Sequence, residues 1–150
     1  MAVTIPIFGK FPENLGGGNV AGDGPMDLLS DTIKQTLHTS TWAPNYSTNE
    51  VKADATNELA TANGYTVGGV TLASKTYAAS ALVTTFDAAD TSWTFTGAVT
   101  FRHAPIWDDT PTAPADPLIL NVDTGGDQTL NGVTSAFQWN ASGIFAFTVT

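Results

Sequence analysis

The sequence predicts a mainly β protein: a single β-sandwich or jelly-roll-like domain with one short helix and an extended N-terminal arm. Three observations lead to this fold class. The chain has 150 residues, a length typical of one domain. It contains 24 threonines, whose β-branched side chains favour strands. From Tyr65 onward, short apolar runs alternate with turn-forming residues, which is the pattern of strands joined by tight connections.

The first 25 residues differ from the rest and are expected to form the arm, with the sandwich domain over residues 26–150. Ile5, Ile7, Phe8 and Phe11 make an apolar segment that precedes a glycine-rich tether. Ordering such a segment costs more conformational entropy than the burial of four side chains recovers. We therefore expect these four residues to bind a neighbouring subunit or another partner by strand addition. The alternative is a terminal strand that docks on the chain's own sheet.

The remaining pattern is one of short strands. The segments expected to form them are 32–39, 65–67, 70–72, 74–78, 82–87, 92–96, 99–107, 118–122, 136–140 and 144–149. The last two are expected to pair as a closing hairpin. Gly125-Gly126 and Asn131-Gly132 are expected to be turns.

One helix is expected over residues 49–61. Val51, Ala55 and Leu59 recur at helical spacing, and Asn63-Gly64 follows as a typical helix end.

The charge balance argues against several partners. There are 14 Asp and Glu against 5 Lys and Arg, giving a net charge of −9. Nucleic acids and anionic membranes bind clustered basic residues, which this chain lacks, so neither is expected as a partner. The absence of cysteine excludes thiol catalysis and disulfide bonds. The N-terminus has no signal-peptide pattern, which predicts synthesis in the cytoplasm.

No catalytic or metal-binding motif stands out. His38 and His103 both fall inside expected strands, where a histidine is usually a packing residue. The acidic pairs, of which Asp123 and Asp127 are one, fit turns better than a calcium shell. We therefore expect no enzyme activity, no cofactor and no bound metal.

The aromatic residues divide into two groups. Trp93 and Trp139 lie in expected strands and are interpreted as core residues. Trp42 and Tyr46 lie in an expected loop, where their rings could stack on a sugar. These two residues are the candidate glycan contacts of an alternative function.

Several motifs, in collinear order over most of residues 8–149, resemble a family of small structural proteins of tailed-bacteriophage particles. They are Phe8–Phe11, Asp31–Lys34, Leu37–Ser40 with Pro44, Asn57-Glu58, Gly64–Leu72, Phe86–Trp93, Pro117–Ile119 and Trp139–Ile144. The resemblance implies a non-enzymatic virion component. It carries over no catalytic residue.

Within that family, the leading hypothesis is a capsid decoration or cement protein. It would bind the major capsid protein on the outer surface of the head, through its arm and as a homo-oligomer, a trimer. The alternative is a module of the tail or a fibre that binds a host surface glycan through Trp42 and Tyr46. The position of the exposed aromatic and apolar residues discriminates between the two hypotheses.

Overall fold

A computed structural model describes residues 2–17 and 26–150 of the chain. The strands, in chain order, are β1 (Ile33–Gln35), β2 (Val70–Thr71), β3 (Thr76–Ser80), β4 (Val83–Asp87), β5 (Thr91–Thr94), β6 (Ala98–Asp108), β7 (Leu118–Asn131), β8 (Thr134–Phe137) and β9 (Phe145–Thr148). One α-helix, α1, covers Phe11–Leu15, and one turn of 3₁₀-helix covers Lys52–Asp54. The expected class is therefore confirmed: the protein is mainly β and sandwich-like, with one short helix.

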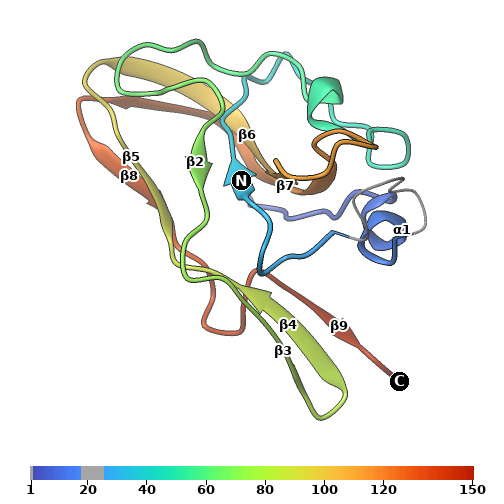
Figure 1. The fold of residues 1–150 in the computed structure, drawn as a ribbon. Helices are drawn as coiled ribbons and strands as arrows, with labels where there is room; N and C mark the ends of the chain where they lie inside the picture. Colours follow the sequence, from blue (N-terminus) through green and yellow to red (C-terminus); the bar gives the residue numbers. More distant parts are fainter. Residues whose placement is uncertain (1, 18–25) are drawn as a thin grey trace.

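The strands form three antiparallel sheets. The largest has the order β2-β1-β6-β7, and its centre is the long pair of β6 and β7. β5 and β8 form a two-stranded ribbon, and β3, β4 and β9 form a third sheet in that order. Figure 1 shows the β3–β4 hairpin and β9 extending away from the rest of the molecule, with the C-terminus beyond β9. We call this third sheet the projecting sheet.

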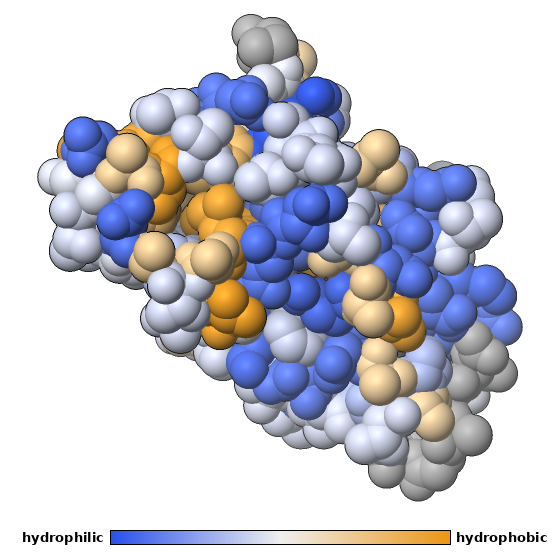
Figure 2. All heavy atoms as spheres, turned by 90° about the horizontal axis from the view of Figure 1, so that it is seen from above, coloured by the Kyte–Doolittle hydropathy of each residue, from blue (hydrophilic) through white to orange (hydrophobic). Residues whose placement is uncertain are grey.

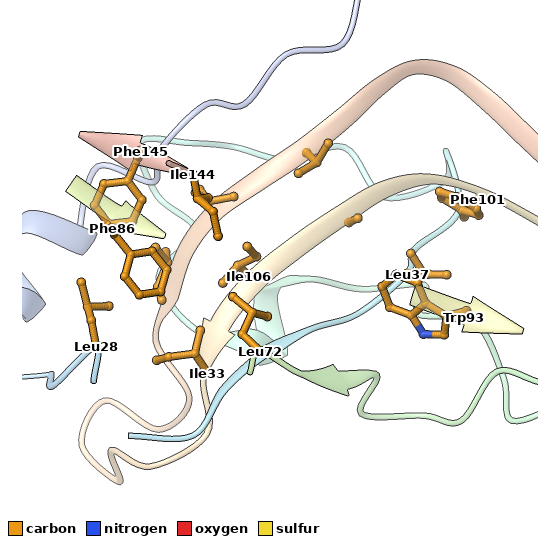
Figure 3. Close-up of a cluster of buried hydrophobic side chains, with 14 of the residues drawn as sticks. Leu28, Ile33, Leu37, Leu72, Phe86, Trp93, Phe101, Ile106, Ile144 and Phe145 are labelled. Atoms are coloured by element: carbon orange, nitrogen blue, oxygen red, sulfur yellow. The ribbon is translucent and has the colours of Figure 1, made fainter. Parts of the chain in front are cut away.

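The core joins the three sheets. Trp93 of β5 and Phe101 of β6 both pack on Phe137 of β8, with ring centroids 5.8 and 6.1 Å from it, so the ribbon covers one end of the large sheet. At the other end, Phe86 of β4 packs on Phe145 of β9 at 5.2 Å. Figure 3 shows Trp93 and Phe101 at one end of the cluster and Phe86 and Phe145 at the other, with Ile106 of the large sheet between them.

The prediction of a helix over residues 49–61 is wrong. Only one 3₁₀ turn forms there: the carboxylate of Asp54 accepts the backbone N–H groups of Glu50 and Val51 and caps the start of the turn, but Ala55, with a ψ of 83°, leaves the helical region. Asn57 then adopts a positive φ of 58°, which no helix continues through. The next residue, Glu58, bridges to His38 as extended chain.

The prediction that residues 136–140 and 144–149 pair as a hairpin is also wrong. β8 pairs with β5 and β9 pairs with β4, so the chain between them crosses from one sheet to another. The expected turn at Gly125-Gly126 is a bulge inside β7, opposite a register shift on β6 between Phe101 and His103. Most other expected strands occur, but residues 65–67 form none, and β7 runs on from the expected 118–122 to Asn131.

Helix α1 lies where the sequence predicted only an irregular arm. Pro12 is at its start, where a proline's missing N–H costs no hydrogen bond. Before the helix, Thr4 and Ile7 bridge to Asp123 and Leu120 of β7. The N-terminal segment is therefore docked on the chain's own sheet. Most of the expected glycine tether, residues 18–25, lies outside the described residues.

Candidate functional site

The four apolar residues of the N-terminal segment do not form one exposed surface. Phe8 and Phe11 are fully buried in their own domain, and Ile7 packs against its core, whereas Ile5 is 43% exposed. The prediction that Phe8 and Phe11 contact a partner is therefore corrected: in this structure both side chains are buried inside their own domain. The backbone hydrogen bonds that the segment needs come from β7: Thr4 exchanges two with Asp123, each 2.9 Å long.

Each buried phenylalanine has its own aromatic neighbours. The ring of Phe8 lies 5.2 Å from that of Tyr46 and 6.4 Å from that of Trp42. The ring of Phe11 lies 5.4 Å from that of Phe145 in β9. The N-terminal segment thus packs against both a surface loop and the projecting sheet.

The two candidate glycan contacts lie together, but they differ in exposure. Trp42 is only 3% exposed, so its ring is a core element and not the surface platform that the sequence suggested. Tyr46 is half-buried. Both line a depression of about 280 Å³ together with Arg102, His103 and Asp123. We call this depression the polar pocket.

An ion pair forms one wall of the polar pocket. The Arg102 guanidinium donates from Nε and Nη2 to the two carboxylate oxygens of Asp123, over 3.0 and 3.1 Å. This contact lowers the pKa of Asp123 and raises that of Arg102. Asp123 was interpreted from the sequence as half of an acidic turn pair with Asp127. Its partnership with Arg102 depends on the β6–β7 register, which the sequence pattern does not reveal.

His103 is held rigidly beneath this ion pair. It is 3% exposed, and burial lowers its pKa, so its ring is neutral near pH 7. Its Nδ1 lies 3.2 Å from Nδ2 of Asn121, which also donates to the Tyr46 hydroxyl over 3.1 Å. The ring forms another hydrogen bond with the backbone of Trp42. Both ring nitrogens therefore form hydrogen bonds inside the protein, and His103 is a buried structural residue, as expected of a histidine in a strand.

The polar pocket offers hydrogen-bonding groups rather than a catalytic arrangement. An arginine, a carboxylate, a phenol and an aromatic wall can recognise a polar, uncharged ligand. No group of three or more His, Asp or Glu suited to a metal ion occurs within residues 2–17 and 26–150. In the same part of the chain, no helix is long and apolar enough to cross a membrane.

The projecting sheet has a different character, because its two edge strands, β3 and β9, carry no charged side chain; the charged residue of this sheet is Asp87, at the end of the central strand β4. Residues 76–86 contain no Asp, Glu, Lys, Arg or His, and neither do residues 128–150. Thr76, Ala78 and Ser80 of β3 are exposed, as are Ala146 and Thr148 of β9. Among the described strands, β3 and β9 each pair with β4 alone. Both edges of this sheet therefore present unpaired backbone groups without the charges or prolines that usually block strand addition.

The chain was compared with known proteins, and no family model, curated protein or solved structure matches it.

Proposed function

We propose that the protein is a non-enzymatic structural component of a bacteriophage particle. In this proposal it is a capsid decoration or cement protein that binds the major capsid protein on the outside of the head and assembles as a homo-oligomer, a trimer. The observation that carries the proposal is the projecting sheet, with its two open, uncharged edges. The motif resemblance to small virion proteins supports the assignment to a phage particle.

The charge distribution supports attachment through this sheet. Copies that each carry a net charge of −9 repel one another, and exposed ion pairs contribute only about 0–1 kcal/mol each. A contact surface without charged side chains avoids both repulsion and desolvation of ions. Backbone pairing along β3 or β9 would then supply hydrogen bonds, and the small Thr, Ala and Ser side chains would allow close approach.

The test uses purified phage heads that lack the protein, to which the full-length chain is added. Wild-type protein should bind saturably, and electron microscopy of gold-labelled protein should place it on heads and not on tails. The variant Ala78→Lys puts a charge in the middle of the exposed edge strand β3 and should reduce binding at least tenfold. The matched control is Ala60→Lys, because Ala60 is an exposed alanine outside all three sheets.

A salt series adds an independent measurement. Raising salt to 1 M shortens the Debye length to about 3 Å, which weakens repulsion between acidic copies and leaves backbone pairing intact. The amount retained on heads should stay constant or rise. Release of the protein at moderate salt, or equal binding of Ala78→Lys and wild type, would show that the projecting sheet is not the attachment surface.

A second candidate function is glycan binding by a tail- or fibre-associated module. The observation that favours it is the polar pocket, where Tyr46 lies beside Arg102 and Asp123. Tyr46→Ala and Arg102→Ala should then abolish binding to a bacterial-surface glycan and leave head binding unchanged. Trp42→Ala is unsuitable for this test because the buried ring supports the fold. Failure of the wild-type protein to bind any glycan on an array of bacterial polysaccharides would remove this candidate.

A further inference from the structure

Large hydrophobic side chains reach the surface at only a few places. On the face shown in Figure 2, hydrophobic residues form separate groups among hydrophilic ones. The exposed large hydrophobic residues of the described chain are Val3, Ile5, Leu29, Val67, Leu82, Val133 and Val149. Four of them belong to two features: an apolar tip and an apolar pocket.

The tip is the far end of the projecting sheet and consists of Leu82 and Val149. Their side chains are 63% and 67% exposed, and the N–H of Val149 donates to the carbonyl oxygen of Leu82 over 2.8 Å, so the two lie together. The hairpin turn between β3 and β4 contains Ala81 with a φ of 54°. Glycine or asparagine is the usual residue at such a position. Ala81 and Leu82 are therefore unusual residues for this turn, and Leu82 makes the end of the hairpin apolar.

The pocket lies at the other end of β9, where that strand joins the body. It encloses about 310 Å³, and its lining includes Val3, Ile5, Phe137, Trp139 and Ile144. Val3 and Ile5 belong to the N-terminal segment and are exposed at 59% and 43%. None of the side chains that line this pocket is charged. Its volume is at the lower end of the range for ligand pockets and is large enough for a branched apolar side chain.

We propose that the tip of one copy inserts into the apolar pocket of a second copy. This inference deepens the proposed homo-oligomer and depends on it. A tip cannot reach its own pocket, because Ile144 lines the pocket and Val149 is five extended residues further along, about 17 Å away at 3.3 Å per residue. The contact is therefore between molecules.

The charge balance identifies the second copy as the occupant. In a chain with a net charge of −9, two copies approach most easily where neither carries a charged side chain, and the tip and the pocket both meet this condition. The contact is heterologous, since different surfaces of the two copies meet, and such contacts close into a ring when the rotation between copies allows it. In the proposed trimer, each copy gives its tip to the next.

Two variants remove one half of the contact each. Leu82→Glu destroys the tip and keeps the pocket, whereas Ile5→Glu places a charge at the pocket and keeps the tip. Both residues are exposed, so both variants should fold, which circular dichroism checks. Analytical ultracentrifugation should show a wild-type oligomer and two monomeric variants. Val67→Glu changes another exposed valine, in a turn remote from both features, and should leave the oligomer intact.

Mixing the two monomeric variants gives the sharpest test. The intact tip of Ile5→Glu fits the intact pocket of Leu82→Glu, so a one-to-one dimer should form and grow no further. A contact between identical surfaces would give no such complementation. The chain contains no cysteine, so Leu82→Cys mixed with Ile5→Cys should also form a disulfide-linked heterodimer on oxidation.

The outcomes separate this inference from the proposed function. A wild-type oligomer that persists in both glutamate variants would overturn the tip-and-pocket contact and leave the homo-oligomer standing. A wild-type protein that stays monomeric at all concentrations, and also fails to bind heads, would overturn both proposals. A wild-type oligomer with two monomeric variants that do not complement would likewise overturn the contact.

Discussion

The carboxyl group of Asp31 faces that of Asp108, the fully buried last residue of β6, whose Oδ1 accepts the backbone N–H of Thr110. Two carboxylates cannot share a buried site unless one of them holds a proton. Burial, together with the proximity and the negative charge of Asp31, raises the pKa of Asp108 to about 7, although the backbone N–H of Thr110 and the Lys75 ammonium oppose the shift. The pair ties the turn before β1 to the end of β6.

The first prediction is that Asp108 makes a contribution to the free energy of unfolding that falls as the pH rises from about 4 to above 7. His38 and His103, whose pKa values burial lowers, contribute in the opposite direction up to about pH 6.5. The folded protein holds a proton on Asp108 that the unfolded chain has already released at these pH values. The stabilisation is therefore complete below the pKa of the unfolded chain, near 4. It is lost as the pH passes the pKa of Asp108 in the folded protein, about 7, and the total loss is roughly 2–4 kcal/mol of the free energy of unfolding.

Urea titrations at several pH values measure this effect. Asp108→Asn should lack this falling contribution, so its stability relative to wild type should increase from pH 4 to pH 8, and it should be the more stable protein at pH 8. The control is Asp109→Asn, which removes only a partly exposed ion pair with Lys34. An unchanged slope in Asp108→Asn would show that another group titrates.

The second prediction concerns Glu58, which links three parts of the chain. Its carboxylate accepts hydrogen bonds from the Tyr65 hydroxyl and the Gly68 N–H, both over 2.7 Å, and from the Lys52 ammonium over 2.8 Å. Burial alone would raise the pKa of Glu58, but these contacts outweigh burial and lower it. Glu58→Gln should cost roughly 2–3 kcal/mol, since an amide can accept through only one of its two ends.

Thermal and chemical unfolding of Glu58→Gln give this value. Glu13→Gln is the matched control, because its ion pair with Lys10 is exposed and should change stability by less than about 1 kcal/mol. Equal stabilities for the two variants would contradict the role of Glu58 as a buried link.

The third prediction compares two glycines of similar backbone conformation. Gly69 and Gly132 have φ values of 69° and 62°. A Cβ at Gly69 would collide with the backbone carbonyl of Gln35 in β1, whereas a Cβ at Gly132 would meet no atom within 4 Å. Gly132→Ala should therefore cost only about 1–2 kcal/mol of backbone strain. Gly69→Ala should cost clearly more, or prevent folding, and comparable midpoints for the two variants would show that β1 and β2 can separate at this point.

The fourth prediction follows from the docked N-terminal segment. Phe8→Ala should cost about 3–5 kcal/mol, because it leaves a cavity beside Tyr46 and Trp42. Ile5→Ala should change stability by less than about 1 kcal/mol, because its side chain is substantially exposed. Urea unfolding measures both. A small effect of Phe8→Ala would mean that the segment is not part of the folded domain.

The sequence pattern predicted the strands well because turn residues bound them on both sides. Val83–Asp87 and Ala98–Asp108 are examples, and Trp93 is a buried core residue as expected, at 5% exposure. Trp139 is only partly buried and lines the apolar pocket, so its prediction as a core residue holds in part. Its position depends on how the chain crosses between sheets, which periodicity does not encode.

The candidate sites were harder to predict for the same reason. The interpretation of the N-terminal segment correctly required backbone hydrogen bonds from elsewhere, but β7 of the same chain supplies them. The prediction of a helix over residues 49–61 failed because the backbone leaves the helical region at Ala55 and Asn57, although Asp54 caps the start of the turn and the apolar residues recur at helical spacing. Arg102 and Asp123 meet only through the bulged register of β6 and β7, which arises from tertiary structure.

The pairing of Thr4 with Asp123 and of Ile7 with Leu120 also constrains how the protein is made. Ribosomes add about 5–20 residues per second and release the N-terminus first, so β7 emerges several seconds after the segment that it must hold. During that interval Phe8 and Phe11 have no strand to dock on, and the nascent chain displays them to solvent. Translation must be nearly complete before β7 is available to cover this apolar segment.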